Sequence, residues 1–373
     1  MPEILDWQRM SDPRQAIRRA AEVLRRGGLV GFPTETVYGV AASALIPEGV
    51  ERLATCKGRP ESKPMTLAIG GASEALDWVP TMSRLGRRLA RRCWPGPVTL
   101  VYSQGAEAGL ASRLDERVRQ RVCPEGSLGL RTPAHEAILR VLQALAGPLV
   151  LTSANRSGEP DATTGSGVVE ALGDQLDLVV DDGPSRYGQA STVVQVNGAS
   201  WKVLREGVVR TDVLERLSAC SIVFVCTGNT CRSPLAEGLC KKLLAERLGC
   251  PMEELPARGF VVLSAGLAAM MGGPAAPEAV EVANSFQVDL SGHRSQALTP
   301  QLLAEADYLV VMTRGHAVAL LEQFPDLQGR VSLLGTDGTD IPDPIGAPRD
   351  VYEECARQIL NGLERLLPEV QQS

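Results

Sequence analysis

The chain has 373 residues, enough for about two domains, and 44% of them are apolar, so packed cores are expected. A formal net charge of −6 argues against a protein that binds nucleic acid through an overall basic surface. The nine scattered cysteines and three histidines fit neither a disulfide framework nor a zinc cluster. Because the amino terminus also shows no basic-then-apolar signal, we expect a cytoplasmic protein that does not enter a membrane.

The first elements are a predicted helix and a short buried strand that runs into polar residues. Residues 14–26 are rich in arginine and alanine with helical spacing, and Gly27-Gly28 ends the helix. Residues 29–32 predict a strand, which is followed by Pro33-Thr34-Glu35-Thr36. Hydroxyls at a sheet edge are a usual place for ligands, although an ordinary turn with exposed threonines would have the same residues.

A Gly/Pro-rich loop then gathers three cations within seven residues, Lys57, Arg59 and Lys63. Such a loop can neutralise a polyphosphate, although charge alone favours a solvated loop.

Several later strands also end in polar or cationic residues. The strand ends fall at Leu130-Arg131, at Thr152-Ser153-Ala154-Asn155, at Ser191-Thr192 and at Leu204-Arg205. These ends are expected to converge on one pocket.

Together these segments resemble the threonylcarbamoyl-adenylate synthase family with the YrdC-like fold, across roughly residues 10–210. The resemblance rests on the Pro33–Gly39 segment, the Lys57/Arg59 loop, Ser153-Ala154-Asn155, Ser191-Thr192-Val193 and Leu204-Arg205-Glu206-Gly207. It implies a twisted mixed sheet with helices. It also implies synthesis of threonylcarbamoyl-AMP from L-threonine, bicarbonate or CO2, and ATP with Mg²⁺, for tRNA threonylcarbamoyladenosine modification by a downstream transferase.

The resemblance also assigns roles to single residues. ATP is assigned to Lys57, Arg59, Arg131, Asn155 and Arg205, and threonine to Thr34, Ser153, Ser191 and His135. A plain surface position is the alternative for His135. Many family members carry a histidine near the position of Ala68, and this chain departs from that pattern. No Walker-type G-x-x-x-x-G-K loop is present, so dispersed cations must hold the nucleotide.

An arginine cluster at positions 84, 87, 88, 91 and 92 has spacing that predicts one helix face. A solvated face is the preferred interpretation, and contact with double-stranded RNA or another anionic partner is the alternative. Residues 211–217 predict a short helix between two domains, 1–212 and 219–373.

The second domain is organised around a loop that begins at Cys226. An apolar run, residues 221–225, predicts a buried strand before the loop, and Leu235, Leu239 and Leu243 predict a helix after it. We expect Ser233 to be the N-cap and Pro234 the first helical residue. The loop's N–H groups and the helix dipole then favour an anion, as does the cation Arg232. A buried structural cysteine beside a tight turn is the alternative.

This loop resembles that of the low-molecular-weight protein phosphatases, and the match covers roughly residues 220–370. Ser264-Ala265-Gly266-Leu267 and the loop Asp340-Ile341-Pro342-Asp343-Pro344 also look like family segments. The resemblance implies a doubly wound parallel sheet and cofactor-free hydrolysis of a phosphoprotein through a cysteinyl-phosphate. Cys226 is then the nucleophile, Arg232 the phosphoryl ligand and Asp343 the general acid, while Ser233 helps to hold the thiolate. Phosphate binding is assigned to Thr227, Gly228, Asn229, Thr230, Cys231 and Ser233, and no metal is implied.

Two positions bear on the phosphoamino acid that is cleaved. Thr230 and the Ile345-Gly346 pair stand where tyrosine-specific relatives usually carry a larger aliphatic residue and aromatic residues, respectively. This pattern resembles the protein-arginine-phosphatase branch, so phosphoarginine is the predicted substrate and phosphotyrosine the alternative. A redox-sensing role for the thiol pair Cys226 and Cys231 stays open, as does a first domain that only binds RNA or nucleotide.

Overall fold

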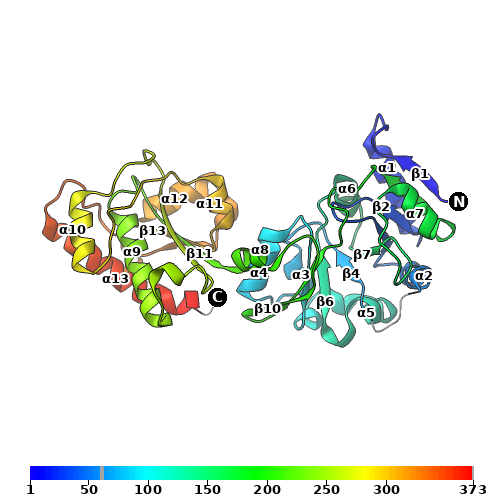
Figure 1. Ribbon diagram of the computed structural model, residues 1–373, viewed down its shortest axis with the longest axis horizontal. Helices are drawn as coiled ribbons and strands as arrows, with labels where there is room; N and C mark the ends of the chain where they lie inside the picture. The colour runs from blue at the N-terminus through cyan, green and yellow to red at the C-terminus, as the bar shows by residue number, and fades with distance from the viewer. Residues whose placement is uncertain (59–62, 372–373) are drawn as a thin grey trace. The chain divides into compact units, whose positions relative to one another are not determined.

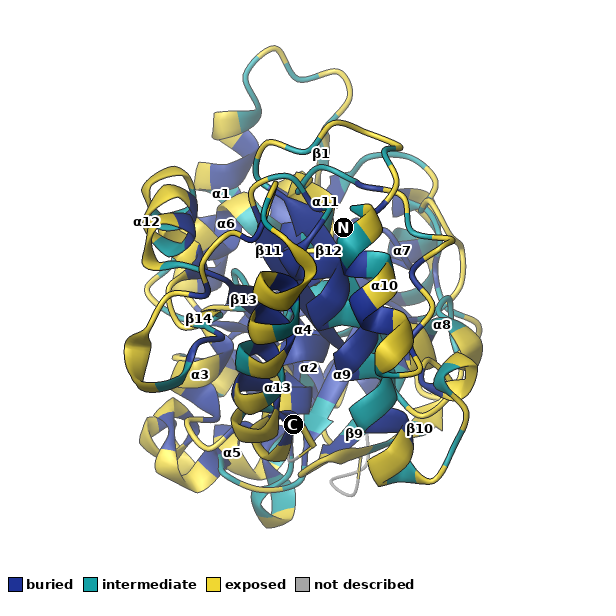
Figure 2. Cartoon of the chain, turned by 90° about the vertical axis from the view of Figure 1, so that its left-hand side faces the viewer, coloured by how far each residue is buried: buried dark blue, intermediate teal, exposed yellow. Residues whose placement is uncertain are grey.

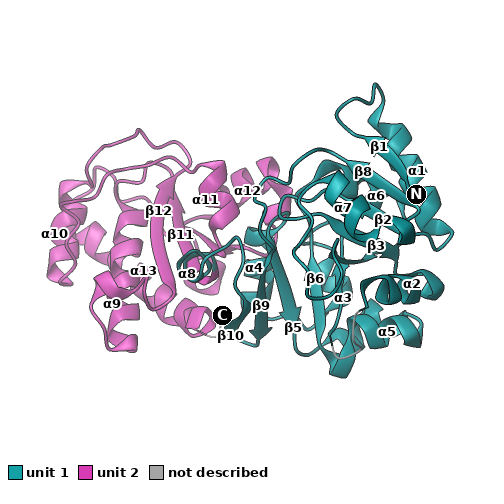
Figure 3. Ribbon diagram, turned by 45° about the vertical axis from the view of Figure 1, so that its right-hand side comes forward, with its two compact units in different colours: residues 1–217 teal, residues 218–373 magenta. Residues whose placement is uncertain are grey.

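The computed structural model describes residues 1–58 and 63–371, so Arg59 lies outside the described residues. The chain forms two compact units, residues 1–217 and 218–373 (Figure 3). Figure 1 gives the order of the helices and strands along the chain. Over the described residues, no helix combines the length and the apolar character needed to cross a membrane.

Unit 1 is built on one mixed sheet. In the described part of this unit its ten strands follow the order β1-β8-β2-β3-β7-β4-β6-β5-β9-β10, with both parallel and antiparallel neighbours. The strands are β1 (Glu3–Asp6), β2 (Val30–Phe32), β3 (Gly39–Ser43), β4 (Thr66–Ala68), β5 (Val98–Tyr102), β6 (Leu128–Arg131), β7 (Leu149–Ser153), β8 (Leu178–Asp181), β9 (Thr192–Asn197) and β10 (Ser200–Arg205). The helices are α1 (Pro13–Arg25), α2 (Pro47–Lys57), α3 (Ala75–Trp78), α4 (Arg84–Cys93), α5 (Glu116–Val122), α6 (Glu136–Ala144), α7 (Gly165–Leu172) and α8 (Thr211–Ser218). The predicted twisted mixed sheet with helices is confirmed.

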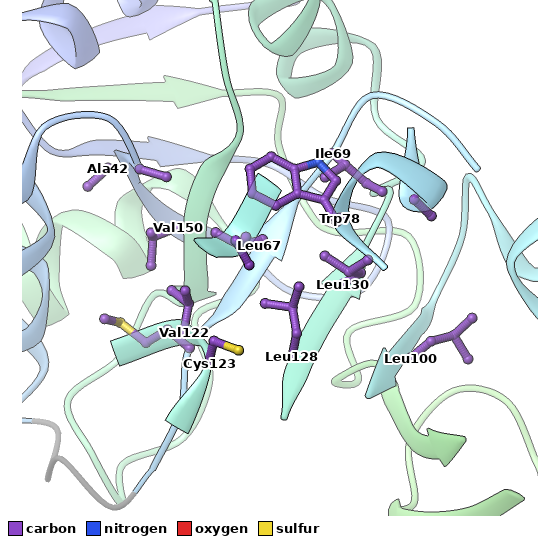
Figure 4. Close-up of a cluster of buried hydrophobic side chains, with 14 of the residues drawn as sticks. Ala42, Leu67, Ile69, Trp78, Leu100, Val122, Cys123, Leu128, Leu130 and Val150 are labelled. Carbon is purple, nitrogen blue, oxygen red and sulfur yellow. The ribbon is translucent and has the colours of Figure 1, made fainter. Parts of the chain in front are cut away.

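Local signals set several of these boundaries. The side chain of Asp12 accepts a hydrogen bond from the backbone N–H of Arg14, which caps α1, and Pro13 occupies the first turn. Gly27 then adopts φ +77°, a conformation that favours glycine, and so ends the helix. Side chains of the central strands pack with Trp78 of α3 in the core (Figure 4).

The arginine cluster on α4 is not a uniformly solvated face. Arg88 is buried, on the side of the helix that also buries Leu85 and Leu89, whereas Arg84 and Arg87 are exposed. The prediction of one solvated face is therefore wrong for Arg88. Charge spacing locates a face of a helix, but it does not say which side the sheet covers.

Unit 2 has a parallel sheet in the order β12-β11-β13-β14. Its strands are β11 (Cys220–Cys226), β12 (Phe260–Gly266), β13 (Tyr308–Val311) and β14 (Val331–Leu333). Its helices are α9 (Arg232–Leu248), α10 (Pro277–Ser285), α11 (Pro300–Glu305), α12 (Arg314–Gln323) and α13 (Arg349–Gln371).

Alternation along β11 explains why helices cover both faces of this sheet. Ile222 and Phe224 join one buried cluster with side chains of α9, α10 and α13. Val223 and Val225 point to the opposite face and join a second cluster with side chains of α11 and α12. Figure 2 shows the buried centre between helices that are exposed on their outer sides. The predicted doubly wound parallel sheet is confirmed.

Candidate active sites

The Cys226 side chain lies at the carboxyl end of β11, at the centre of a tight loop. Its Sγ is 2.9 Å from Ser233 Oγ and accepts a hydrogen bond of 3.2 Å from the backbone N–H of Asn229. Cys226 is buried, so its sulfur contacts these two polar groups out of reach of bulk solvent.

Ser233 is not the N-cap that the sequence predicted. Helix α9 begins at Arg232 and Cys231 precedes it, so Ser233 and Pro234 both lie within the first turn. Because the loop turns tightly, the helical backbone begins at Arg232, one residue before Ser233. The Ser233 hydroxyl therefore contacts the Cys226 sulfur and does not cap the backbone N–H groups of the first helical turn.

Asn229 holds the loop in this shape. Its backbone has φ +55°, which is uncommon for a residue other than glycine, and its side chain is buried. The amide Nδ2 donates to Ser233 Oγ and to Ser264 Oγ, both at 2.9 Å, and Oδ1 accepts from the backbone N–H of Gln296 at 2.9 Å. These bonds stabilise a strained conformation that directs the Asn229 N–H toward the sulfur.

Arg232 and Asp343 form an ion pair beside the loop. The Arg232 side chain is 4% exposed and the Asp343 side chain 40% exposed. Arg232 also donates to the carbonyl of Ile341 at 3.3 Å, while its Nε is buried without a hydrogen-bond partner among the described residues. A buried guanidinium with an unused donor, next to the N-terminus of α9, is suited to an anion, which would compete with Asp343.

Three further side chains around the loop received no role from sequence reasoning. Tyr352 OH lies 3.3 Å from Cys231 Sγ, and burial raises the pKa of both groups. His316 Nε2 lies 3.0 Å from Thr227 Oγ1, and burial lowers the pKa of His316. Ser264 belongs to a segment quoted for the family resemblance, but its bond to Asn229 depends on the fold. None of these contacts has a sequence-local signal, because each joins residues more than thirty positions apart.

In unit 1 a cavity of about 330 Å³ opens among the strand ends. Five of the predicted binding residues line it, from separate parts of the chain: Thr34, Arg131, Ser153, Ser191 and Arg205. The expectation that polar strand ends would meet at one pocket therefore agrees with their observed placement.

The two arginines of this cavity are held by different partners. Arg131 donates to Glu35 Oε1 at 2.7 Å and to Thr36 Oγ1 at 2.9 Å, and both ends of the Arg131–Glu35 pair are buried. Arg205 donates to the carbonyl of Ser191 at 2.8 Å, and burial lowers its pKa. Sequence reasoning missed Glu35, although it lies directly beside Thr34.

Lys57, at the end of α2, is buried behind the cavity wall. Its Nζ donates to the Ser153 carbonyl at 2.6 Å, to Asn155 Oδ1 at 2.5 Å and also to the Asn155 carbonyl. Ser153 Oγ donates to the same Asn155 Oδ1 at 2.6 Å. The structure thus joins three predicted residues in one hydrogen-bonded cluster.

His135 faces a neighbouring cavity of about 350 Å³, which Thr34 also lines. Its Nε2 lies 3.0 Å from Asp182 Oδ2, and its Nδ1 accepts from the backbone N–H of Ala137 at 3.2 Å. His135 is therefore placed apart from the cavity that Ser153 and Ser191 line.

Two family models match this chain, and the boundary between them falls where the structure divides the chain into units 1 and 2. Residues 22–207 match the family model Sua5/YciO/YrdC, described as "Telomere recombination", and residues 221–373 match "Low molecular weight phosphotyrosine protein phosphatase".

Three curated relatives are similar to one part each. The "Threonylcarbamoyl-AMP synthase" of Pyrococcus abyssi is 34% identical over 203 residues, which are 54% of this chain and 56% of that relative, so the chain spans little more than half of its length. The "Putative threonylcarbamoyl-AMP synthase" of Mycobacterium tuberculosis (strain ATCC 25618 / H37Rv) is 33% identical over 205 residues, 54% of this chain and 90% of the relative. The "Probable low molecular weight protein-tyrosine-phosphatase EpsP" of Ralstonia nicotianae is 35% identical over 151 residues, 40% of this chain and 95% of the relative.

The solved structure of a P. abyssi Sua5 mutant covers 89% of this chain and 99% of its own, with a TM-score of 0.52. At 22% sequence identity this is a likeness of fold alone.

Proposed function

We propose that this chain is a bifunctional enzyme. The premise is its membership of two families: it belongs to the Sua5/YciO/YrdC family through residues 22–207 and to the low-molecular-weight phosphotyrosine protein phosphatase family through residues 221–373. Unit 1 forms threonylcarbamoyl-AMP from L-threonine, bicarbonate or CO2, and MgATP. Unit 2 hydrolyses a phosphoprotein, with phosphoarginine preferred.

The observation that carries the first activity is the convergence of Arg131 and Arg205 on one cavity with the hydroxyls of Thr34, Ser153 and Ser191. In the proposed reaction a carbamate oxygen of N-carboxythreonine attacks the α-phosphorus of ATP, and pyrophosphate leaves. The protein must hold the two reactants together and stabilise negative charge on the departing pyrophosphate. The arginines suit the phosphates, and the small hydroxyls suit the amino acid.

Lys57 supports this cavity from behind. Because its ammonium is bonded to both carbonyls of the Ser153–Asn155 turn, it fixes the strand end that carries Ser153. Its charge also contributes to the positive potential that a polyphosphate would meet.

Pyrophosphate release tests the synthase proposal. The full chain should release pyrophosphate from MgATP only when L-threonine and bicarbonate are both present. A chain that binds ATP or RNA but never releases pyrophosphate under these conditions would instead be a recognition module. In the proposed context, the product passes to a cytoplasmic transferase that modifies tRNA.

The observation that carries the second activity is the Cys226 sulfur, which accepts from the Asn229 N–H and contacts Ser233 Oγ beside the Arg232–Asp343 pair. In the proposed mechanism the sulfur attacks phosphorus, a P–S bond forms, and the bond to the leaving group breaks as Asp343 donates its proton. Water then attacks the cysteinyl-phosphate while Asp343 takes a proton from it. Arg232 and the loop N–H groups bind the phosphoryl oxygens throughout.

The preference for phosphoarginine rests on the side chains around the loop. Thr230 presents a small hydroxyl residue beside Cys231, and the residues that follow Asp343-Pro344 are Ile345 and Gly346, which offer no ring for a phenyl group to stack upon. The Asp343 carboxylate also attracts a guanidinium. The name of the Ralstonia relative favours phosphotyrosine as the second candidate. Measured kcat/KM values for phosphoarginine and phosphotyrosine decide between them, and a higher value for phosphotyrosine would reject the arginine assignment.

A further inference from the structure

A cavity of about 640 Å³, here named the edge cavity, runs along the outer edge of the sheet in unit 2. Its lining includes the four consecutive residues 260–263 of β12, which is the last strand on that side of the sheet. Alternate side chains of a strand point to opposite faces, so a cavity that meets four residues in a row lies against the strand's edge. Among the described residues, none of residues 226–232 lines this cavity. The edge cavity is therefore separate from the candidate phosphatase site.

The fold uses only part of the outer edge of β12. Near the carboxyl end of the strand, the N–H of Gly266 donates to the carbonyl of Gln296 at 3.0 Å, and Nε2 of Gln296 donates to the carbonyl of Ser264 at 2.9 Å. Backbone groups on one edge recur at every second residue, so Val262 presents its N–H and C=O on this edge as well. In the described part of the chain, no strand pairs with β12 at this position. Val262 therefore offers one donor and one acceptor to an added strand.

Side chains that line the edge cavity are already fixed by hydrogen bonds. The carboxylate of Glu237 accepts from Lys241 Nζ at 2.5 Å and from Ser264 Oγ at 2.6 Å. His293 Nε2 lies 2.8 Å from the carbonyl oxygen of Asn229. Because these walls do not have to be ordered when a ligand enters, less binding free energy is lost.

The rest of the lining combines apolar side chains with two carboxylates. Leu255, Val288 and Leu290 line the cavity and are buried. Glu253 and Asp289 also line it, and both are exposed. Unlike Glu237, neither of them forms an ion pair with another described residue. The edge cavity therefore suits a ligand that has both apolar groups and positive charges.

We propose that an extended polypeptide segment, in which apolar and basic residues alternate, binds in the edge cavity as an additional strand beside β12. Its backbone pairs with the edge at Val262, its apolar side chains cover the apolar lining, and its basic side chains meet the two carboxylates. A small organic cation would reach the carboxylates but would leave the Val262 N–H and C=O without partners, whereas an extended chain pairs with both. This inference depends on neither proposed activity, because no catalytic role is assigned to a residue that lines this cavity.

Isothermal titration calorimetry with short blocked peptides tests the proposal on the full chain. One peptide alternates lysine with valine, and the other alternates glutamate with valine. The wild type should bind the lysine peptide about tenfold more tightly, and this preference should weaken as the salt concentration rises. Equal affinity for the two peptides, or no binding of the lysine peptide, would overturn the proposal.

The double variant Glu253→Gln/Asp289→Asn removes the two charges while it keeps the shape of both side chains. Its affinity for the lysine peptide should fall about tenfold. The matched control is Glu322→Gln/Asp326→Asn, which removes the same charge from two exposed residues of unit 2 outside the cavity. The control should bind like the wild type, and an equal loss in both double variants would reduce the effect to net charge and reject the site.

Hydrogen exchange resolved to single amides distinguishes strand addition from simple charge attraction. The saturating lysine peptide should slow exchange at Val262 about tenfold or more and leave Val261, whose N–H faces β11, unchanged. A bound peptide without this protection would refute the added strand. Protection of Val262 that rises with protein concentration in the absence of peptide would assign the edge to a second copy of this chain, which also contradicts the proposal.

Discussion

Replacing Glu35 with glutamine should destabilise unit 1 strongly, although it changes only one atom. Glu35 Oε1 accepts from Arg131 at 2.7 Å, and Oε2 accepts from the backbone N–H of Ala134 at 2.9 Å. The side chains of the ion pair are 5% and 9% exposed. The neutral amide would leave the Arg131 charge buried without a counter-charge.

The expected cost is about 3 kcal/mol. Breaking a buried ion pair by removing one partner costs about 3–5 kcal/mol, and the lower end applies because the glutamine oxygen can still accept from Ala134. With a urea m-value of about 3 kcal/mol per M, the unfolding midpoint should fall by about 1 M.

Tryptophan fluorescence makes this measurement specific to unit 1 in the full chain. The four tryptophans, Trp7, Trp78, Trp94 and Trp201, all lie in that unit. Hydrolysis of p-nitrophenyl phosphate reports separately that unit 2 is intact.

Glu48→Gln is the control, because Glu48 pairs with Arg117 at 3.0 Å on the surface, where ion pairs contribute little. Adding Arg131→Met to the Glu35→Gln variant should recover part of the loss, since the lone buried charge is then removed. A midpoint shift for Glu35→Gln no larger than that of Glu48→Gln would refute the reasoning.

Four other changes test the two sites. Lys57→Ala should lower threonylcarbamoyl-AMP formation by about 10²-fold, because the strand end that carries Ser153 loses its support and shifts, while p-nitrophenyl phosphate hydrolysis continues; full synthase turnover would show that Lys57 does not position this strand end. Thr230→Ile should lower kcat/KM for phosphoarginine and raise it for phosphotyrosine, a change in ratio of about 10–200-fold, and a constant ratio would contradict the arginine assignment. Mild peroxide should inactivate the wild-type phosphatase reversibly but Cys231→Ser irreversibly, because Cys231 can form a disulfide with oxidised Cys226; equal recovery on adding a thiol reductant would exclude that role. Because burial lowers the His316 pKa, its contribution to stability is complete above about pH 6.5 and is lost as the pH falls through the folded-state pKa. The protection factors of unit 2 amides, in which hydrogen exchange is divided by its intrinsic rate at each pH, should therefore fall more in the wild type than in His316→Asn between about pH 7 and about pH 5. An equal fall would show that other groups dominate.

Sequence reasoning predicted those features that are determined by residues close together in the chain. Residues 14–26 were expected as a helix, and the structure has α1 at Pro13–Arg25, because proline and glycine mark both ends locally. The strand before Cys226 was equally clear from its apolar run.

Local sequence patterns did not predict the contacts that depend on tertiary packing between distant residues. The N-cap position predicted for Ser233 was wrong, because the loop's path turns its hydroxyl to Cys226. The family resemblance alone implied that Ser233 helps to hold the sulfur, whereas the local pattern of serine before proline did not. The partnership of Lys57 with Asn155 joins residues 98 positions apart, and a cation in a Gly/Pro-rich loop gave no hint that its ammonium is buried.

The linker between the two units is so short that the chain can be divided into separate fragments at few positions. Leu214 of α8 is buried in the core of unit 1, and Arg92 donates to the carbonyl of Leu217 at 2.8 Å. Helix α8 ends at Ser218 and β11 begins at Cys220, so Ala219 alone separates them. A recombinant fragment that stops at residue 212 would expose the pocket that Leu214 fills, and one that begins after 220 would shorten a central strand. Fragments for separate expression should therefore be divided between Ser218 and Ala219. In the undivided chain, every proposed synthase site is made together with one proposed phosphatase site.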